Sequence, residues 1–255
     1  MHLIIDLGNT RVKFFVFHEN RILHRTFEPI PAWKNTLKKI QKKYPTISNC
    51  IISDVNGSIT NDLKVSLGSI SVFFCSPKLK LPFKTLYKSK KQLGADRIAL
   101  LSACILDFPN KNVFVIDLGT CITYDFIDKK SLHHGGAISP GLKMRYKALN
   151  FFTGGLPLLN PEISDKFLGD STESSIHTGI TNGIITEINE HICYHKKNCK
   201  DLIVIFSGGD AQRLSKPFKN KIFADTNFLA KGLNFILVNN FCLLYTSDAA
   251  DDKQC

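Results

Sequence analysis

Two aspartates occupy matching positions in the two halves of the chain. Asp6 and Asp117 each end an apolar run, and each is followed by Leu-Gly and then by a threonine, Thr10 or Thr120. Carboxylates, hydroxyls and the backbone N–H groups of a glycine turn are the groups that hold phosphates and their metal ions. One such motif alone indicates an ordinary strand-ending turn. The pair predicts an internal duplication that serves phosphoryl transfer.

A third carboxylate, Asp96, lies in Gly94-Ala95-Asp96-Arg97, at the start of a helix expected over 93–108. A positioned carboxylate accepts the proton of an alcohol as a P–O bond forms. The neighbouring guanidinium offers a planar fork for a carboxylate or phosphoryl group. Without further support, the pair also fits a helix-start carboxylate beside a surface arginine.

The residues alone also fit two other kinds of functional site. Carboxylates on neighbouring strands also hold the two metals of a nuclease of the ribonuclease H type, but that chemistry does not require the glycine pair in 207–211. That pair would let the backbone approach a flat ligand such as a nucleobase. His191, His195 and Cys199, with Cys193 between them, have helical spacing for zinc. The lysines nearby oppose a cation and favour a solvated helix end.

Hydrophobic periodicity predicts the elements that must position these groups. Apolar alternation and short apolar runs predict strands over 3–6, 12–17, 22–27, 50–53, 70–75, 113–117, 121–127 and 202–206. Helical spacing predicts helices over 33–44, 59–67, 93–108, 142–151, 174–195 and 227–243. We expect a basic surface loop over 77–91 and a glycine-rich loop over 134–141.

Composition narrows the class of protein. The 255 residues are 44% hydrophobic and 22% charged, with a net charge of +11, so the chain can bury a core. No apolar run approaches the roughly 20 residues of a membrane span, and the start has no signal-peptide layout. The lysine clusters fit solvated faces better than a nucleic-acid site. The eight cysteines include no C-x-x-C pair, which favours reduced thiols in the cytoplasm.

The order of the motifs resembles type III pantothenate kinase, a family of the acetate and sugar kinase/Hsp70/actin superfamily. The resemblance covers about residues 3–240. It rests on these stretches, in order: Asp6-Leu-Gly-Asn-Thr10 with Lys13, Leu93-Gly-Ala-Asp-Arg97, Asp117-Leu-Gly-Thr-Cys-Ile-Thr123, Gly135-Gly-Ala-Ile-Ser-Pro-Gly141, residues 153–157, Thr172 and residues 207–211.

The resemblance implies an α/β fold of two ribonuclease H-like domains with mixed sheets flanked by helices, an actin-like ATPase duplication with ATP in the cleft. We set the domains at 1–111 and 112–246, and regard 247–255 as a non-native tail because it looks like translated adaptor sequence. The family's activity would be the phosphorylation of pantothenate to 4'-phosphopantothenate, the first step of coenzyme A synthesis. It implies ATP, Mg2+, potassium or ammonium, and a homodimer.

The resemblance also implies site residues. Asp96 would accept the proton of the pantothenate hydroxyl, and Asp117 would hold the monovalent cation. The ATP-binding residues would be Asp6, Leu7, Gly8, Asn9, Thr10, Arg11, Val12, Lys13 and Thr120. The pantothenate-binding residues would be Tyr87, Gly94, Ala95, Asp96, Arg97 and Thr172, the last reached across the dimer.

Some positions depart from the family's pattern. Cys121 stands where a small residue is usual, and Ser171 precedes Thr172 where asparagine is common. The segment before Gly94, which follows Tyr87, is basic and lacks the usual proline. Two other functions fit the same fold: a nucleotide-binding regulator with little or no kinase activity, and a kinase of another small hydroxyl substrate such as a sugar.

Overall fold

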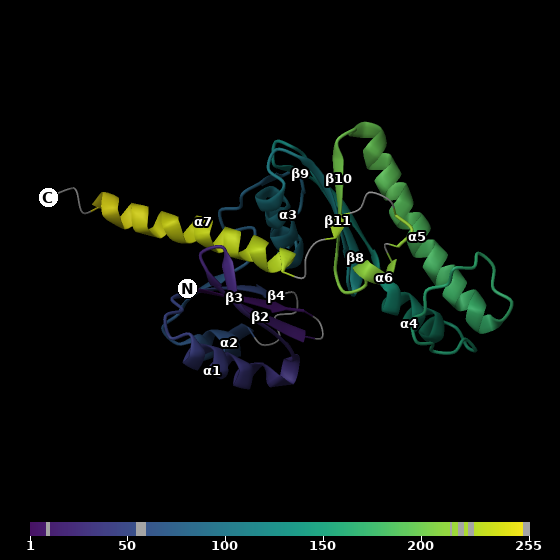
Figure 1. Ribbon diagram of the computed structural model, residues 1–255, viewed down its shortest axis with the longest axis horizontal. Helices are drawn as coiled ribbons and strands as arrows, with labels where there is room; N and C mark the ends of the chain where they lie inside the picture. The colour runs from purple at the N-terminus through teal and green to yellow at the C-terminus, as the bar shows by residue number, and fades with distance from the viewer. Residues whose placement is uncertain (9–10, 55–59, 215, 219–221, 224–226, 252–255) are drawn as a thin grey trace. The chain divides into compact units, whose positions relative to one another are not determined.

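The computed structural model describes residues 1–8, 11–54, 60–214, 216–218, 222–223 and 227–251 (Figure 1). By their contacts these fall into two compact units. The first is Met1–Asp107 together with Asn227–Cys255, and the second is Phe108–Thr226. The division at residue 111 stays a prediction. The contacts assign the last helix to the first unit rather than to the second.

The first unit is built on a mixed sheet in the order β3-β2-β1-β4-β5. Strands β1, β2 and β3 are antiparallel neighbours, whereas β1, β4 and β5 run parallel. Their bounds are β1 His2–Leu7, β2 Arg11–His18, β3 Arg21–Pro29, β4 Asn49–Asp54 and β5 Ser71–Phe74. Because β1 lies beside both β2 and β4, Asp6 pairs in register with Lys13 on one side and Ser53 on the other.

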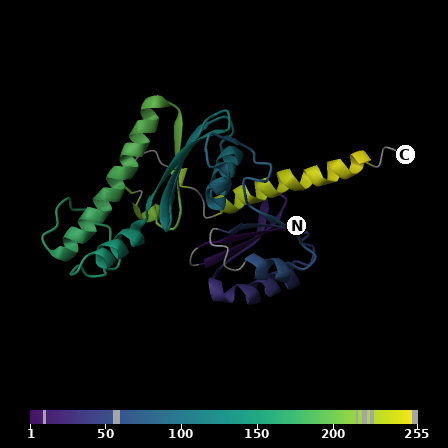
Figure 2. The same cartoon turned by 180° about the vertical axis from the view of Figure 1, so that it is seen from behind.

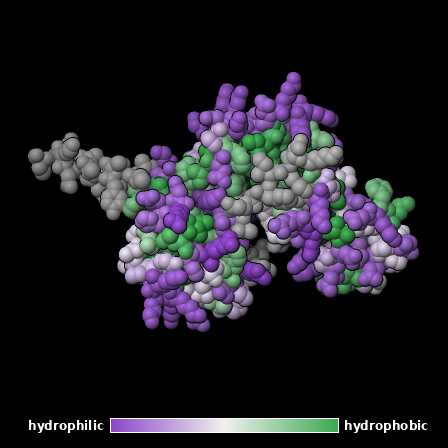
Figure 3. Space-filling model, in the orientation of Figure 1, coloured by the Kyte–Doolittle hydropathy of each residue, from purple (hydrophilic) through white to green (hydrophobic). Residues whose placement is uncertain are grey.

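Helices α1 (Trp33–Lys43) and α2 (Thr60–Leu67) cover one face of this sheet (Figures 1 and 2). In α1 the side chains of Trp33, Leu37 and Ile40 are buried, which gives the apolar stripe of an amphipathic helix. The lysines of α1 lie on its exposed side, where hydrophilic side chains follow the helix in Figure 3. A 3-10 turn, Ile30–Ala32, precedes α1.

Helices α3 (Ala95–Asp107) and α7 (Phe228–Asp251) pack on each other and on the middle strands β1 and β4. Their approach is close, because a Cβ on Gly232 of α7 would lie 1.9 Å from the carbonyl oxygen of Ala99 in α3. Glycine is therefore required at that crossing. Between β5 and α3 lie only the short strand β6 (Lys84–Thr85) and the 3-10 turn Lys90–Gln92.

The second unit repeats the topology of the first. Five of the six strands of its sheet follow the order β11-β10-β7-β8-β9, with β7, β8 and β9 antiparallel and β7, β10 and β11 parallel. The bounds are β7 Asn112–Leu118, β8 Cys121–Ile127, β9 Leu132–Pro140, β10 Leu202–Ser207 and β11 Ile222–Phe223. Since β7 takes the place of β1, Asp117 takes the place of Asp6. The predicted duplication is thus present at the level of strand order.

Helices α4 (Leu142–Phe152), α5 (Thr172–Asn198) and α6 (Ala211–Leu214) accompany this second sheet. The isoleucines of α5 join the side chains of β7, β8 and β10 in one buried cluster. The N-terminus of α5 is fixed by a capping box, in which the Ser171 hydroxyl accepts from the backbone N–H of Ser174 and the Ser174 hydroxyl accepts from the backbone N–H of Ser171. Such a box satisfies backbone groups that a helix start leaves without partners.

Two expectations about local structure were wrong. The predicted loop over 134–141 is mostly strand β9, paired with β8. Its Gly136 serves close packing, because a Cβ there would lie 1.7 Å from the Tyr124 carbonyl oxygen. The last helix also continues past residue 243 to Asp251. No glycine or proline interrupts that stretch, so nothing in it stops a helix.

Candidate active site

Asp6 lies at the end of β1 and forms an ion pair across the hairpin. Its Oδ2 lies 2.8 Å from Lys13 Nζ, and the residue is only 5% exposed. The Gly8 N–H donates to the Arg11 carbonyl at 3.0 Å and closes the turn. The predicted ATP-binding stretch is thus a strand–turn–strand with a cation beside a carboxylate. Asn9 and Thr10 lie outside the described residues, while Leu7 and Val12 point into the core.

Asp96 lies in the first turn of α3. Its Oδ1 accepts the backbone N–H of Arg97 at 2.8 Å, and the helix N-terminus favours a negative charge there. The carboxylate turns back over Gly94, since a Cβ on Gly94 would lie 2.5 Å from that same oxygen. The first helical hydrogen bond runs from the Ile98 N–H to the Gly94 carbonyl, 3.0 Å. The Gly-Ala-Asp-Arg stretch therefore fixes where the carboxylate lies.

Arg97 and Tyr87, both predicted to bind substrate, lie together. The guanidinium carbon is 5.2 Å from the centre of the tyrosine ring, a cation–π arrangement that holds the arginine plane. Arg97 is only 4% exposed. The ring therefore orients a buried guanidinium beside Asp96.

Cys75 connects Asp6 with the start of α3. Its Sγ donates to the Ala95 carbonyl at 3.5 Å. Burial, and then the charges of Asp96 and Asp6, raise the pKa of the Cys75 thiol to about 12. The hydrogen bond to Ala95, together with the Cys75 N–H bond to the Ile52 carbonyl, connects the start of α3 with the strands β4 and β1 that carry Ser53 and Asp6.

Asp117 ends β7 in the second unit and pairs in register with Thr123 on β8 and Ser207 on β10. The turn after it closes through the Gly119 N–H, which donates to the Cys121 carbonyl at 3.1 Å. Thr120 is exposed. The Asp-Leu-Gly-Thr motif thus presents its hydroxyl residue at the surface of a closed turn.

The glycine pair after β10 packs on this same turn. Gly208 has φ +92°, and a Cβ there would lie 2.4 Å from the Leu118 carbonyl oxygen. The Asp210 N–H donates to that oxygen at 3.0 Å. This backbone contact fixes the loop over 207–211 beside the end of β7. Position 208 requires glycine, because its φ is positive and because the Leu118 carbonyl leaves no room for a Cβ.

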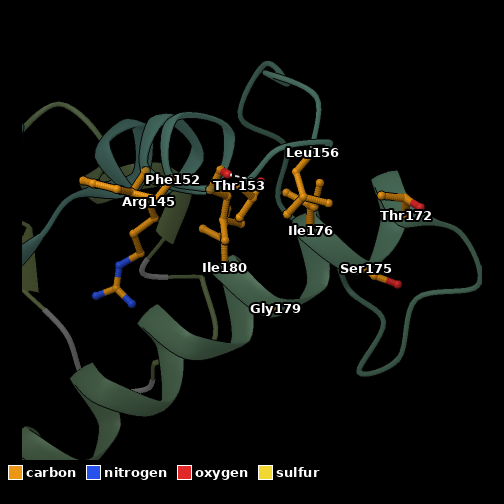
Figure 4. A pocket seen from close by; sticks show the side chains of 11 residues that line it. Arg145, Phe152, Thr153, Leu156, Thr172, Ser175, Ile176, Gly179 and Ile180 are labelled. Atoms are coloured by element: carbon orange, nitrogen blue, oxygen red, sulfur yellow. Dashed lines mark hydrogen bonds between the residues drawn. The ribbon is translucent and has the colours of Figure 1, made fainter.

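Thr172 is the first residue of α5 and lines a groove of about 900 Å³ between α4 and α5. In Figure 4, Thr172 lies at one end of the groove and Arg145 at the other, with Ile176 and Ile180 between them. Most of the lining is apolar: Ala148, Leu149, Phe152, Leu156, Ile176 and Ile180. Thr172 therefore lies beside an apolar surface of the second unit.

The histidines at zinc-like spacing pack on aromatic rings. His191 stacks on Tyr124 with ring centres 4.2 Å apart, and His195 lies 4.3 Å from Phe114 and 4.9 Å from Phe126. Within the described part of the chain, no three or more His, Cys, Asp or Glu side chains gather as a metal site. The helical spacing of His191 and His195 therefore reflects their packing on the aromatic rings of the sheet.

The family follows from comparison with known proteins. A family model described as type III pantothenate kinase matches residues 2–193. The chain belongs to this family. It is 47% identical over 241 residues to the type III pantothenate kinase of Christiangramia forsetii, covering 94% of this chain and 99% of the relative. The enzyme of the same name from Flavobacterium johnsoniae is 40% identical over 235 residues, with 92% and 96% covered.

Solved structures share the fold. A member of the Baf family of proposed transcriptional activators from Campylobacter jejuni has a TM-score of 0.65 at 24% identity, covering 93% of this chain and 98% of its own. The activator of 2-hydroxyisocaproyl-CoA dehydratase from Clostridium difficile, with bound ADPNP, has a TM-score of 0.54 at 10% identity, with 98% and 97% covered. These likenesses confirm the expected α/β fold class with two mixed sheets. The family match does not favour the regulator alternative.

Proposed function

We propose that the chain transfers the γ-phosphoryl group of ATP to the primary hydroxyl of pantothenate, the first step of coenzyme A synthesis. The proposal is supported by the family match over residues 2–193. In the first unit, the observation that carries it is that Cys75, which follows β5 beside the strands that hold Asp6 and Ser53, donates through its thiol to the Ala95 carbonyl next to Asp96. A phosphate-facing turn and a candidate base are the two groups that phosphoryl transfer to an alcohol needs.

Asp96 is the proposed base. The hydroxyl oxygen of pantothenate attacks the γ-phosphorus, the bond to the β–γ bridging oxygen breaks, and ADP leaves with that electron pair. The hydroxyl proton passes to the Asp96 carboxylate. Arg97, held by Tyr87, binds the pantothenate carboxylate, while Gly94 and Ala95 leave room for the substrate beside the helix start. This division of roles uses the carboxylate as acceptor and the guanidinium as anchor.

ATP is proposed to be bound by Asp6, Leu7, Gly8, Asn9, Thr10, Arg11, Val12 and Lys13, and by Thr120 of the second unit. Lys13 Nζ, already held beside Asp6 at 2.8 Å, supplies positive charge for phosphate oxygens. The Gly8 turn supplies the close backbone approach that phosphates require.

Two cations complete the proposal. Mg2+ prefers carboxylate oxygens and keeps several waters, and Asp6 provides such an oxygen beside the Ser53 hydroxyl, which has no hydrogen-bond partner among the described residues. Asp117, in the equivalent place of the second unit, is proposed to hold potassium or ammonium. When bound, these ions neutralise charge on the phosphates.

We further propose that the chain acts as a homodimer in the cytoplasm, with the groove of Figure 4 covered by a second copy. Phe151, Phe152, Phe167 and Leu168 are each 80% or more exposed. Figure 3 shows apolar side chains projecting where the loop before α5 turns. So many exposed aromatic and aliphatic groups together mark a protein interface. Thr172, at the end of the groove, would then contact pantothenate in the partner.

Among the described residues, no helix contains an apolar stretch of the length needed to span a lipid bilayer.

The experiment is a phosphotransfer assay with ATP, pantothenate, MgCl2 and KCl, followed by mass detection of phosphopantothenate. Asp96→Asn should bind nucleotide with unchanged affinity and lose about 10²- to 10⁴-fold in kcat. Asp107→Asn, at the other end of α3, is the matched control and should retain turnover. Absence of product from the wild-type chain at millimolar pantothenate would refute the proposed function. Full turnover by Asp96→Asn would refute the role of this carboxylate.

A further inference from the structure

A row of polar side chains crosses the first sheet from β2 toward the start of α3. Lys13, Asp6 and Ser53 are register partners on β2, β1 and β4. The Cys75 N–H donates to the Ile52 carbonyl at 2.8 Å, which continues the β4–β5 pairing and places Cys75 beside Ser53. Because register partners in a sheet point to the same face, all four side chains lie on one face. This is the face covered by α3 and α7.

Three members of this row have partners. Lys13 and Asp6 pair with each other, and the Cys75 thiol donates to the Ala95 carbonyl. Ser53 differs from them. It is 0% exposed, and its Oγ has no hydrogen-bond partner among the described residues. Buried hydroxyls are nearly always hydrogen-bonded, because leaving one without a partner destabilises the fold.

The position of Ser53 indicates what that partner is. It lies next to the Asp6 carboxylate in the ladder, and on its other side lies Cys75, whose thiol is turned to the Ala95 carbonyl. A hydroxyl both donates and accepts hydrogen bonds, so beside a carboxylate it suits a water molecule. Mg2+ is bound with one or two carboxylates and retains several of its waters. The donor set therefore fits a hydrated cation better than a bare one.

We propose that Ser53 Oγ binds a water molecule that enters with the nucleotide and is held against Asp6. This inference rests on the proposed function, in which Asp6 faces the phosphates. Ser53 thereby becomes a ligand-binding residue of the site, although no sequence motif includes it. The water comes either from the hydration shell of Mg2+ or with the nucleotide itself, and the two sources differ in their dependence on Mg2+.

The test compares Ser53→Ala with Ser102→Ala, a matched control on α3. Ser102 is also 0% exposed, but its Oγ donates to the Ile98 carbonyl at 2.8 Å. Without ligand, Ser53→Ala should melt at the same temperature as the wild type or higher, because it removes a buried hydroxyl that has no partner. Ser102→Ala should melt lower, because it loses a hydrogen bond. A lower melting temperature for ligand-free Ser53→Ala would overturn the proposal.

Calorimetric titration with ADP then measures binding, once with Mg2+ and once with EDTA. For Ser53→Ala we expect the Kd to rise about three- to tenfold, the effect of one hydrogen bond, while Ser102→Ala keeps the wild-type Kd. If the Kd rises only in the titration with Mg2+, the water belongs to the hydration shell of the cation. If the Kd rises in both titrations, the water enters with the nucleotide. Both results support the proposal, and an unchanged Kd in both overturns it.

A second variant covers a folding failure of Ser53→Ala. Ser53→Cys keeps the size of the side chain with a weaker donor, so the Kd of ADP should rise above that of the wild type; an unchanged Kd overturns the proposal. The readout is nucleotide binding, not pantothenate turnover. If the wild-type chain binds ADP but fails to phosphorylate pantothenate, the proposed function fails while the result for Ser53 stands.

Discussion

Gly94 controls where the Asp96 carboxylate lies. A Cβ at position 94 would be 2.5 Å from Asp96 Oδ1, whereas contacts of real Cβ atoms under 3.0 Å are essentially never seen. In Gly94→Ala the nearest group free to move is the carboxylate, because it is the end of a side chain. It must move by at least 0.5 Å, the difference between 3.0 and 2.5 Å, and a comfortable contact of 3.4 Å requires 0.9 Å. The hydrogen bond from the Arg97 N–H then weakens or breaks.

Gly94→Ala should lower turnover while leaving the stability of the fold nearly unchanged. Loss of the hydrogen bond costs about 1 kcal/mol, and replacing glycine by alanine gains about 0.4–1 kcal/mol through the unfolded chain. The two nearly cancel, so the melting temperature should stay within about 3 °C of the wild type. A misplacement of about 1 Å in a catalytic group lowers the rate by about 10²-fold. We therefore expect kcat to fall roughly 10- to 100-fold.

The assay is steady-state kinetics with thermal unfolding measured on the same samples. Gly183→Ala on α5 is the control, because its Cβ would meet only the Arg145 guanidinium at an ordinary 3.7 Å. This variant should keep wild-type kcat. If Gly94→Ala also keeps its kcat and its melting temperature, Gly94 does not position the carboxylate and the reasoning fails.

Two further outcomes are expected. Burial, and then the charges of His191 and His134, lower the pKa of His195 from its ordinary 6.5. Below about pH 6.5 the unfolded chain therefore binds more protons than the folded chain does. The free energy of unfolding should fall as the pH drops through that value. Urea unfolding between pH 7.5 and 5.5 measures this, and an equal slope in His195→Phe would contradict it. Phe152→Asp places a charge on an 81% exposed aromatic position of the groove. It should convert the proposed dimer to monomer in light scattering, whereas Lys38→Asp on α1 should not. A monomeric wild type would refute the proposed interface.

Much of the fold could be predicted from the sequence because its strands are short, apolar and bounded by turns. The repeated Asp-Leu-Gly motif located equivalent strands, and five strands of the second sheet follow the order of the first. The strand over Leu132–Pro140 was missed because its glycines also fit a turn. What required glycine there was the backbone of the neighbouring strand at Tyr124. A contact of that kind is not visible in local sequence.

Site residues could be predicted from the sequence only where they belong to a continuous motif. Asp96 and Arg97 stand in a continuous stretch, but Ser53 and Cys75 become relevant through register with Asp6, 47 and 69 residues away along the chain. Nor did the sequence indicate which sheet the last helix covers. Its residues are apolar on most sides, so periodicity does not indicate a partner. Sheet pairing and long-range packing decide these features, and both lie beyond a single-sequence pattern.

The first unit is assembled from both ends of the chain, and this sets the order in which it can fold during synthesis. Helix α7 packs on α3, with Gly232 against Ala99, and the Asn234 side chain bonds to His2 and to the Glu19 carbonyl. A ribosome that has passed Asp107 still has 144 residues to add before Asp251, which takes about 7 to 30 s at usual rates of translation. The second unit can close on itself during that time. Helix α3, which begins at Ala95, gains its packing partner α7 only after the second unit has been synthesised, so nascent chains should acquire nucleotide binding only once α7 is made.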